Sequence, residues 1–321
     1  MNVYRDIADF RTLVLLPASG LYALGWMAYE AIYQLGWKKA ARPHRPVICV
    51  GNLTVGGMGK TPVTAHVAET LLSLGHQVVI SANGYRSPRQ EGATLAPEGD
   101  LDAREWGDEP ALLRQMLADV PLVVGRRRVE AAKIVHERFP NAVMLMDDGV
   151  QHLPLHRDIT ILLEPKKSRN PLCLPAGPYR EPRKRGLRKA DLVLPRPPFD
   201  LSAQYGDPIG DPIPEGADVQ IVTAIAQPER FRSLVEHMGY RVVAGRFWPD
   251  HDPLDRALDD PRLRPGVPLL TTQKDWVKLG RHRDRFHGPL AVIPYRVAIE
   301  PEDQFRQWLK EKLDGVLAEK S

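Results

Sequence analysis

The chain has 321 residues, of which 43% are hydrophobic and 26% are charged, a composition typical of a globular protein with one large or two medium domains. The net charge of +4 mildly favours anionic partners, but no nucleic-acid-binding motif accompanies it, so we expect no nucleic-acid partner. The two cysteines, Cys49 and Cys173, match no metal or redox spacing, and nothing in the sequence requires an oxidising compartment.

The N-terminal segment has an unusual composition. Residues 13–29 carry no charge, and the run is at the short limit of the roughly 17–25 residues that a membrane-spanning helix needs. One interpretation is a buried helix packed on the main domain. We favour a membrane anchor, either spanning or shallow, because basic residues that suit anionic lipid head groups and a cytoplasmic location follow at once: Lys38, Lys39, Arg42 and Arg45.

The strongest motif runs from Val47 to Thr64. A short apolar strand leads into a glycine-rich turn, and Gly-Lys-Thr then opens a segment with helical spacing. This is the order of a phosphate-binding P-loop, in which backbone N–H groups and the start of a helix surround the phosphates. We therefore predict a nucleotide site formed by Thr54, Val55, Gly56, Gly57, Met58, Gly59, Lys60 and Thr61.

The chemistry of this loop depends on its last residues. Lys60 is expected to reach the outer phosphates, and the Thr61 hydroxyl to ligate Mg²⁺. The pattern is imperfect, because Thr54 stands where the common P-loop has its first glycine. The alternative is a chance Gly-Lys-Thr, which the strand-to-helix setting disfavours.

Beyond the P-loop, apolar runs of strand length alternate with segments of helical spacing. Such alternation predicts a P-loop-like, mostly parallel sheet with helices on both faces. The predicted strands are residues 47–50, 77–81, 122–124, 142–146 and 159–163, and the predicted helices are residues 62–74, 110–118 and 129–138.

A proline-rich passage at residues 195–214 interrupts this alternation and is the predicted linker. A smaller α/β unit follows it, with strands predicted at 219–224, 241–243, 268–271 and 291–293 and helices at 228–237 and 301–313. We therefore predict a membrane-associated helix with its basic flank at 1–40, a P-loop domain at 41–214 and a smaller C-terminal domain at 215–321.

Two carboxylates, Asp147 and Asp148, follow an apolar strand. P-loop enzymes hold Mg²⁺ partly through an acid at such a strand end, and adjacent acids repel each other unless a cation is near. The alternative is a surface turn, for which Asp-Asp-Gly is a common composition. We favour a magnesium site that includes Thr61. Just beyond lie two candidates for contact with substrate or metal, Gln151 and His152.

Four further residues have open interpretations. Asp108 begins a predicted helix, where it either caps the helix or accepts a proton from a hydroxyl; the residues alone favour the cap. Arg86 and Arg180 lie in loops where each either meets an anionic group or is only solvated. His251 stands between two acids that can raise its basicity, although a lone loop histidine is more often structural.

Residues 271–275 read Thr-Thr-Gln-Lys-Asp and resemble the guanine-reading signature of GTPases. Lys274 and Asp275 are adjacent, whereas that signature has a residue between them, so the geometry fails and GTP is disfavoured. Two other classes stay open as alternatives: a P-loop GTPase-type switch or metallochaperone, and a membrane-tethered binding module that has lost catalysis. The intact Lys60 and Thr61 oppose the second.

Together these motifs resemble the tetraacyldisaccharide 4′-kinases of lipid A biosynthesis in Gram-negative bacteria. That family also lacks the first P-loop glycine and carries an N-terminal hydrophobic helix. The matching blocks follow the family's order along nearly the whole chain, at residues 51–62, 84–86, 107–110, 147–152, 174–178, 180–182, 249–251 and 271–275. The sequence departs from the family's pattern at Asn83, Val150, Asp252 and Gln273.

The resemblance implies transfer of the γ-phosphate of Mg-ATP to the 4′-hydroxyl of an acylated glucosamine disaccharide 1-phosphate, which gives lipid IVA. It also implies that Asp108 acts as the base together with His251, with Lys60 on the phosphates. A location at the cytoplasmic face of the inner membrane suits a lipid whose acyl chains stay in the bilayer. We assign substrate contacts to Arg86, Gln151, His152 and Arg180.

Overall fold

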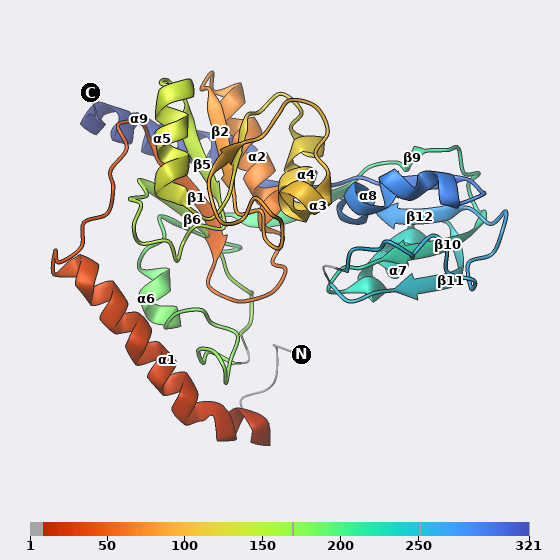
Figure 1. Cartoon of the computed structure of the whole chain (residues 1–321), viewed down its shortest axis with the longest axis horizontal. Coiled ribbons are helices and arrows are strands. Elements are labelled where there is room, and N and C mark those ends of the chain that lie inside the picture. The colour runs from red at the N-terminus through yellow and green to blue at the C-terminus, as the bar shows by residue number, and fades with distance from the viewer. Residues whose placement is uncertain (1–8, 169, 251, 321) are drawn as a thin grey trace.

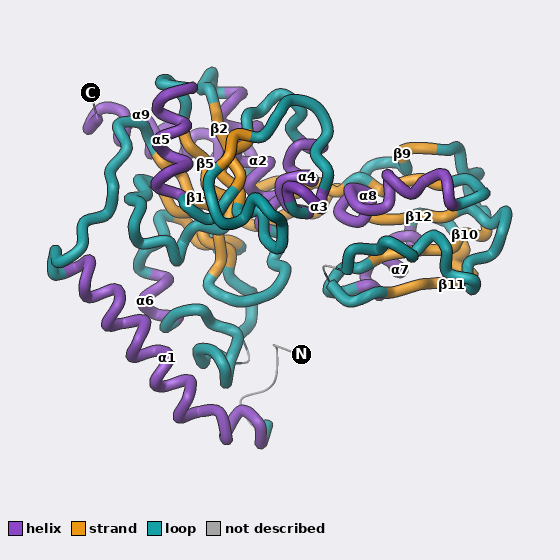
Figure 2. The backbone as a smooth tube through the Cα atoms, in the orientation of Figure 1, coloured by secondary structure: helices purple, strands orange, loops and turns teal. Residues whose placement is uncertain are grey.

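The computed structural model describes residues 9–168, 170–250 and 252–320. Two α/β units lie side by side, and a long N-terminal helix projects from the first unit (Figure 1). Each unit has a sheet at its centre with helices packed outside it (Figure 2). The predicted fold class is therefore confirmed: a P-loop-like, mostly parallel sheet, a smaller α/β unit and an apolar N-terminal helix.

The first unit is built on a seven-stranded sheet with the order β3-β4-β2-β5-β1-β6-β7. Its strands run parallel except for β3, which is antiparallel to β4. Every residue of the four central strands β2, β5, β1 and β6 is buried, as expected for strands that are covered on both faces. The strands are β1 (Val47–Asn52), β2 (Val78–Ala82), β3 (Thr94–Leu95), β4 (Leu122–Val124), β5 (Val143–Asp147), β6 (Ile159–Leu163) and β7 (Leu192–Leu194).

Successive residues of β1 point to opposite faces of this sheet. Ile48 and Val50 pack in one core with α2 (Lys60–Ser73), α4 (Asp108–Met116) and α9 (Glu302–Lys320). Val47 and Cys49 pack in the other core with α5 (Arg128–Arg138). Two short helices complete the unit, α3 (Ala103–Trp106) and α6 (Arg183–Leu187).

Two antiparallel strands connect the units. β8 (Asp200–Tyr205) lies inside the passage that the sequence predicted as a linker, and it pairs along its whole length with β14 (Tyr295–Glu300). The chain therefore leaves the first unit and returns to it through one hydrogen-bonded ribbon. The prolines that flank β8 hid this strand from sequence analysis, because proline normally argues against strand structure.

The second unit has a five-stranded sheet with the order β11-β10-β12-β13-β9, in which β9 is antiparallel and the others parallel. One face packs against α7 and the other against α8 and the loop of residues 254–263. Its elements are β9 (Ile209–Gly210), β10 (Asp218–Thr223), α7 (Pro228–His237), β11 (Arg241–Phe247), β12 (Leu269–Thr272), α8 (Gln273–Leu279), the 3₁₀ helix Gly280–Arg285 and β13 (Leu290–Ile293).

The C-terminal helix corrects the predicted domain division. Phe305, Leu309 and Leu313 are fully buried in the same core as β1 and α2, and Phe305 stacks on His66 of α2 with ring centroids 5.7 Å apart. The predicted domain at 215–321 therefore loses β14 and α9 to the first unit. An amphipathic stripe indicates that a helix buries one face, but not which domain covers it.

The N-terminal helix α1 (Phe10–Gln34) buries polar side chains and exposes apolar ones, the reverse of a helix in a protein core. Its buried residues are Thr12, Ser19 and Glu30, all of them polar, whereas most of its large apolar side chains are exposed. The side chain of Ser19 donates to the carbonyl of Cys173, and Glu30 forms ion pairs with Arg185 and Lys189. The alternative of a buried core helix is therefore wrong.

The position of α9 gives a test of the corrected division. We expect Phe305→Ala to destabilise the first unit by about 3–5 kcal/mol, because the change empties a buried ring site. Hydrogen exchange read by mass spectrometry should then accelerate in β1 and α2 and not in β10 to β13. Gln304→Ala, at an exposed position of the same helix, is the matched control. Acceleration confined to the second unit would restore the predicted boundary.

Candidate active site

The loop between β1 and α2 has the geometry of an anion site. Gly59 adopts a left-handed conformation (φ 72°), and a Cβ there would meet no heavy atom within 4 Å. No side chain of the described residues caps the N-terminus of α2, so its N–H groups face the loop. Gly56 and Gly57 are exposed, while Lys60 and Thr61 are buried in the first turn. A phosphate fits such a helix start.

The structure explains why Thr54 stands in place of the first glycine. Thr54 is buried and forms an antiparallel bridge with Tyr179. On either side of it the Val55 N–H donates to the carbonyl of Pro178 at 2.9 Å, and the Arg180 N–H donates to the carbonyl of Leu53 at 2.7 Å. The backbone here is held by a second segment of chain, and Thr54 does not adopt a positive φ, so no glycine is needed.

The two predicted metal carboxylates lie beside this loop. Asp147 ends β5 and accepts hydrogen bonds from Thr64 Oγ1 at 2.9 Å and Thr61 Oγ1 at 3.4 Å. Asp148 Oδ2 lies 3.5 Å from Lys60 Nζ and 3.1 Å from Arg180 Nη1. One triphosphate can therefore contact Lys60 and a cation held at Asp148 together. The sequence assigned Arg180 to substrate contact, but it did not predict this pairing with Asp148.

Burial and neighbouring charge move the two acids in opposite directions. Burial raises the pKa of Asp147 to about 7, the charge of Glu109 adds to this, and Lys60 opposes it. Burial also disfavours the ionised form of Asp148, but the charges of Lys60 and Arg180 outweigh it and keep the pKa of Asp148 below its ordinary value. A cation bound between the two carboxylates would favour the ionised form of both.

Sequence analysis missed Arg128. This buried side chain donates to Ser81 Oγ at 2.8 Å and to the carbonyl of Asp147 at 2.8 Å, so it fixes the turn that carries both acids. The only available signal was a run of three arginines at the start of a predicted helix, residues 126–128, which resembles an ordinary solvated helix start.

The donor set fits Mg²⁺. The described residues contain no cluster of three or more His, Cys, Asp or Glu side chains able to enclose a metal. Asp147, Asp148 and the Thr61 hydroxyl offer oxygen ligands on one side only, which suits an ion that keeps water and substrate phosphates in its shell. Lys60 and Arg180 now neutralise Asp148, and a bound cation would compete with them.

Gln151 and His152 lie just beyond the acids. Gln151 Nε2 donates to the carbonyl of Asn52 at 3.1 Å and to Glu181 Oε1 at 3.0 Å, which ties the loop after β5 to the start of the P-loop. Burial, together with the charges of Arg128 and Arg157, lowers the pKa of His152 to about 4. His152 is therefore a neutral imidazole at physiological pH.

The Gly84–Arg86 loop meets the start of α4. A Cβ on Gly107 would lie 3.1 Å from the backbone of Gly84, so the two glycines permit a close backbone approach. Gly107 occupies the N-cap of α4, and Asp108 is its first helical residue, so the capping role that the residues alone favoured for Asp108 is wrong. Arg86 is exposed and lies over the ring of Tyr85, 5.3 Å from its centroid.

The second unit reaches the first at Asp108, whose Oδ2 lies 3.6 Å from Lys278 Nζ of α8. His251 lies outside the described residues, but its neighbour Asp250 pairs with Lys274 at 2.8 Å. Asp275 is buried and accepts hydrogen bonds from the hydroxyls of Thr223 and Thr272, and Thr272 caps α8. The segment that resembles the GTPase signature therefore caps the N-terminus of α8.

The fold and this site together define a P-loop nucleotide-binding protein of the phosphotransferase type, with a helix-start anion cradle facing acids at a neighbouring strand end. The chain belongs to the tetraacyldisaccharide-1-P 4′-kinase (LpxK) family, whose sequence model matches residues 11–314. The resemblance predicted from the motifs is therefore confirmed.

Individual relatives agree with this assignment. The chain is 35% identical to a tetraacyldisaccharide 4′-kinase of Verminephrobacter eiseniae over 89% of this chain and 69% of that protein. It is also 35% identical to one of Aromatoleum aromaticum, over 83% of this chain and 84% of that protein. A crystal structure of LpxK from Aquifex aeolicus in complex with ATP superposes with a TM-score of 0.79 at 28% identity, covering 95% of this chain and all of that one.

The raised pKa of Asp147 predicts a trade-off between stability and metal binding. The folded protein holds this proton up to about pH 7, whereas an ordinary Asp releases it near 3.8, so the contribution of this proton to stability is lost as the pH rises from 3.8 to about 7. Without divalent metal, we expect Asp147→Asn to raise Tm relative to wild type at both pH values, and at pH 8 by at least about 2 °C more than at pH 5.

Thermal melts of both forms check this, with the exposed Asp303→Asn as control. Added Mg-ATP should reverse the order at pH 8, since only the wild type keeps the ligand. The prediction would be contradicted if the Tm difference between Asp147→Asn and wild type were no larger at pH 8 than at pH 5.

Proposed function

We propose that this protein transfers the γ-phosphate of Mg-ATP to the 4′-hydroxyl of a tetraacylated glucosamine disaccharide 1-phosphate, forming lipid IVA. The observation that carries the proposal is the 3.5 Å approach of Lys60 Nζ to Asp148 Oδ2, between a P-loop and a strand end, in a chain whose family model spans residues 11–314.

Positioning and charge stabilisation supply most of the catalysis in phosphoryl transfer. The N–H groups of residues 56–60 would hold the β- and γ-phosphates, and the Lys60 ammonium would turn from Asp148 towards their oxygens. Thr61, Asp147 and Asp148 would hold Mg²⁺, which when bound neutralises charge on the phosphate oxygens. Arg180 would then be free to contact an anionic group of ATP or of the lipid.

Asp108 would accept the hydroxyl proton, with His251 in the supporting role that the family resemblance implies. Asp108 is partly buried in the first turn of α4, where the loop of residues 84–86 and the second unit both meet it. The transition state is loose, so the proton moves late and the loss of the base is less damaging than the loss of phosphate contacts. We assign Arg86, Gln151 and His152 to the lipid side of the site.

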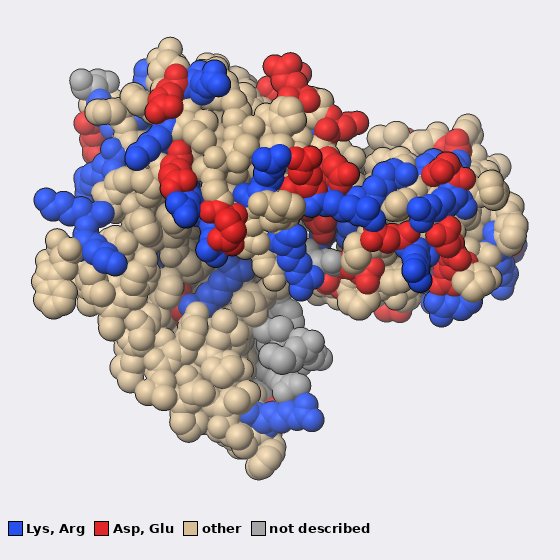
Figure 3. Space-filling model, in the orientation of Figure 1, with Lys and Arg blue, Asp and Glu red and all other residues tan. Residues whose placement is uncertain are grey.

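The exposed face of α1 supports a membrane location. The helix is long and apolar enough to cross a bilayer, yet its polar residues Ser19, Tyr22 and Glu30 contact the first unit. Its outward face is apolar, and the surface of α1 is nearly free of charge in Figure 3. We propose that α1 lies in the cytoplasmic face of the inner membrane with this apolar side inserted, next to the acyl chains of the substrate.

No observation favours the GTPase-type switch or the metallochaperone. Asp275, the acid that would read guanine, is fully buried and bonded to two threonine hydroxyls of its own unit. Such an acid is not available to a base, so ATP is the expected nucleotide.

A direct assay tests the function. Incubation with γ-labelled ATP and the acylated disaccharide 1-phosphate should place label in the lipid, and excess GTP should not compete. We expect Lys60→Ala to lower kcat by about 10³-fold, since it removes a charge aimed at the transferring phosphate. Asp108→Asn should lower it by about 10²-fold. Folded wild-type protein that leaves the lipid unlabelled would end the proposal.

Vesicle binding tests the role of α1. Val14 and Leu21 lie on one face of the helix, two turns apart, and are 61% and 71% exposed. The double change Val14→Glu with Leu21→Glu should weaken binding to anionic lipid vesicles at least tenfold, because burial of each side chain contributes about 1.5–3 kcal/mol. Leu72→Glu, on the exposed side of α2, should leave binding unchanged. Equal binding by the wild type, the double variant and Leu72→Glu would exclude α1 as the membrane contact.

A further inference from the structure

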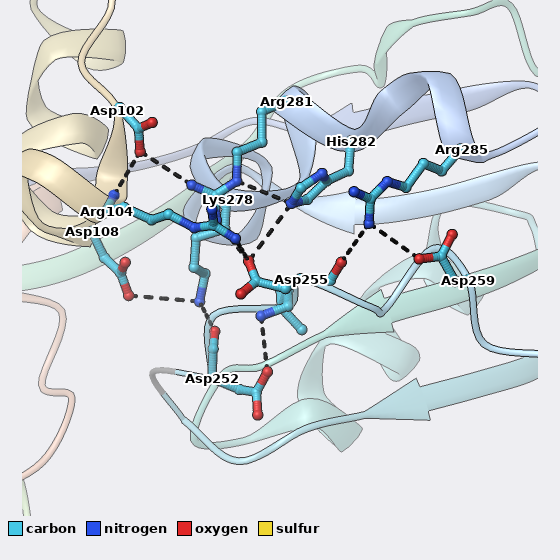
Figure 4. Close-up of polar contacts among 11 residues, drawn as sticks. Asp102, Arg104, Asp108, Asp252, Asp255, Asp259, Lys278, Arg281, His282 and Arg285 are labelled. Atoms are coloured by element: carbon cyan, nitrogen blue, oxygen red, sulfur yellow. Dashed lines mark hydrogen bonds and ion pairs between the residues drawn. The ribbon is translucent and has the colours of Figure 1, made fainter.

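A buried lysine of the second unit contacts the proposed base of the first. Lys278 lies on α8 and is only 2% exposed. Its Nζ lies 3.6 Å from Asp108 Oδ2 on α4, and it donates to the carbonyl of Asp252 at 2.9 Å (Figure 4). The same Nζ lies 3.6 Å from Asp275 Oδ1. An ammonium is almost never buried without such compensation.

The other charged contacts between the units have a different character. Arg104 pairs with Asp255, and Arg281 pairs with Asp102, but at least one side chain in each of these pairs is half exposed. Exposed pairs contribute little, because water and salt screen them. The pair of Lys278 with Asp108 is shielded, and it involves the carboxylate to which the proposed function assigns the proton transfer.

We infer that Lys278 is a positioning residue for Asp108: it holds the carboxylate of the base in place from the second unit, so that the base is complete only when α8 is docked on α4. This inference rests on the proposed function. In the reaction, the sugar oxygen bonds to the γ-phosphorus, the bond from that phosphorus to the β–γ bridging oxygen breaks, and the hydroxyl proton passes to Asp108. Lys278 takes no part in these bond changes.

The chemistry of such a contact is consistent with a late proton transfer. A neighbouring ammonium favours the ionised carboxylate, which is the form that accepts a proton. It also makes that carboxylate a weaker base, which a loose transition state tolerates because the proton moves after most of the phosphoryl transfer. The contact therefore affects the position and the ionised state of the Asp108 carboxylate, and not the binding of ATP.

The test is a double-mutant cycle on kcat in the full-length protein. Lys278→Met removes the charge and keeps the length of the side chain. We expect kcat to fall about 10- to 100-fold, as for a misplaced catalytic group, while the KM values for ATP and lipid change less than about twofold. In the Asp108→Asn background, Lys278→Met should cause no further loss.

Two further variants separate positioning from stability. Arg281→Met removes a cation from the rim of the same interface and should leave kcat within about twofold of wild type. Lys278→Arg keeps a charge in the buried site but changes its shape, so its kcat should fall about three- to tenfold, again only when Asp108 is present. The Arg variant decides the question if the Met variant does not fold.

The outcomes are distinguishable. An equal loss in the Asp108→Asn background would mean a purely structural role, and a weaker affinity for ATP would mean a nucleotide contact; either result overturns the inference. Wild-type kinetics in both Lys278 variants would overturn it too. If the wild type itself does not phosphorylate the lipid, the proposed function fails first, before any variant is compared.

Discussion

Parallel hydrogen bonding between β1 and β5 is the constraint on which the site depends. Val50, just before the P-loop, pairs with Asp147 at the end of β5. Because parallel strands end at the same edge of a sheet, this register places the glycine loop and the two acids side by side. A shift of register by one residue would turn Asp147 away and leave the loop without its acidic neighbour.

The ionic groups around this edge are compensated in a connected series. Asp148 is held by Lys60 and Arg180, and the neighbour of Arg180 in the chain is the fully buried Glu181. Glu181 accepts from Gln151 and pairs with Lys189, which also pairs with Glu30 of α1 at 2.7 Å. Because removing one partner of a buried ion pair is costly, this series of contacts links α1 to the nucleotide site.

The two units contribute unequally to the site. The first contains the P-loop, both acids and the apolar N-terminal helix, and the C-terminal helix also packs on it. The second unit approaches the cradle through α8, whose Lys278 meets Asp108, and it is joined to the first by the β8–β14 ribbon. Both passages of the chain run through that ribbon, so any movement of the second unit would bend one short two-stranded element.

The sequence by itself determined the local elements and the chemistry of the loop. Apolar runs and helical spacing placed β4, β6 and α7 at the bounds the structure gives, and Gly-Lys-Thr with Asp147 and Asp148 named the nucleotide site. Only tertiary structure decided that α9 packs on the first unit and that Arg128 and Lys278 serve the acids. Hydrophobic periodicity indicates that one face of a helix is buried, but not which element covers that face. The covering element, like the partner of a buried charge, lies far along the chain, and only packing brings the two together.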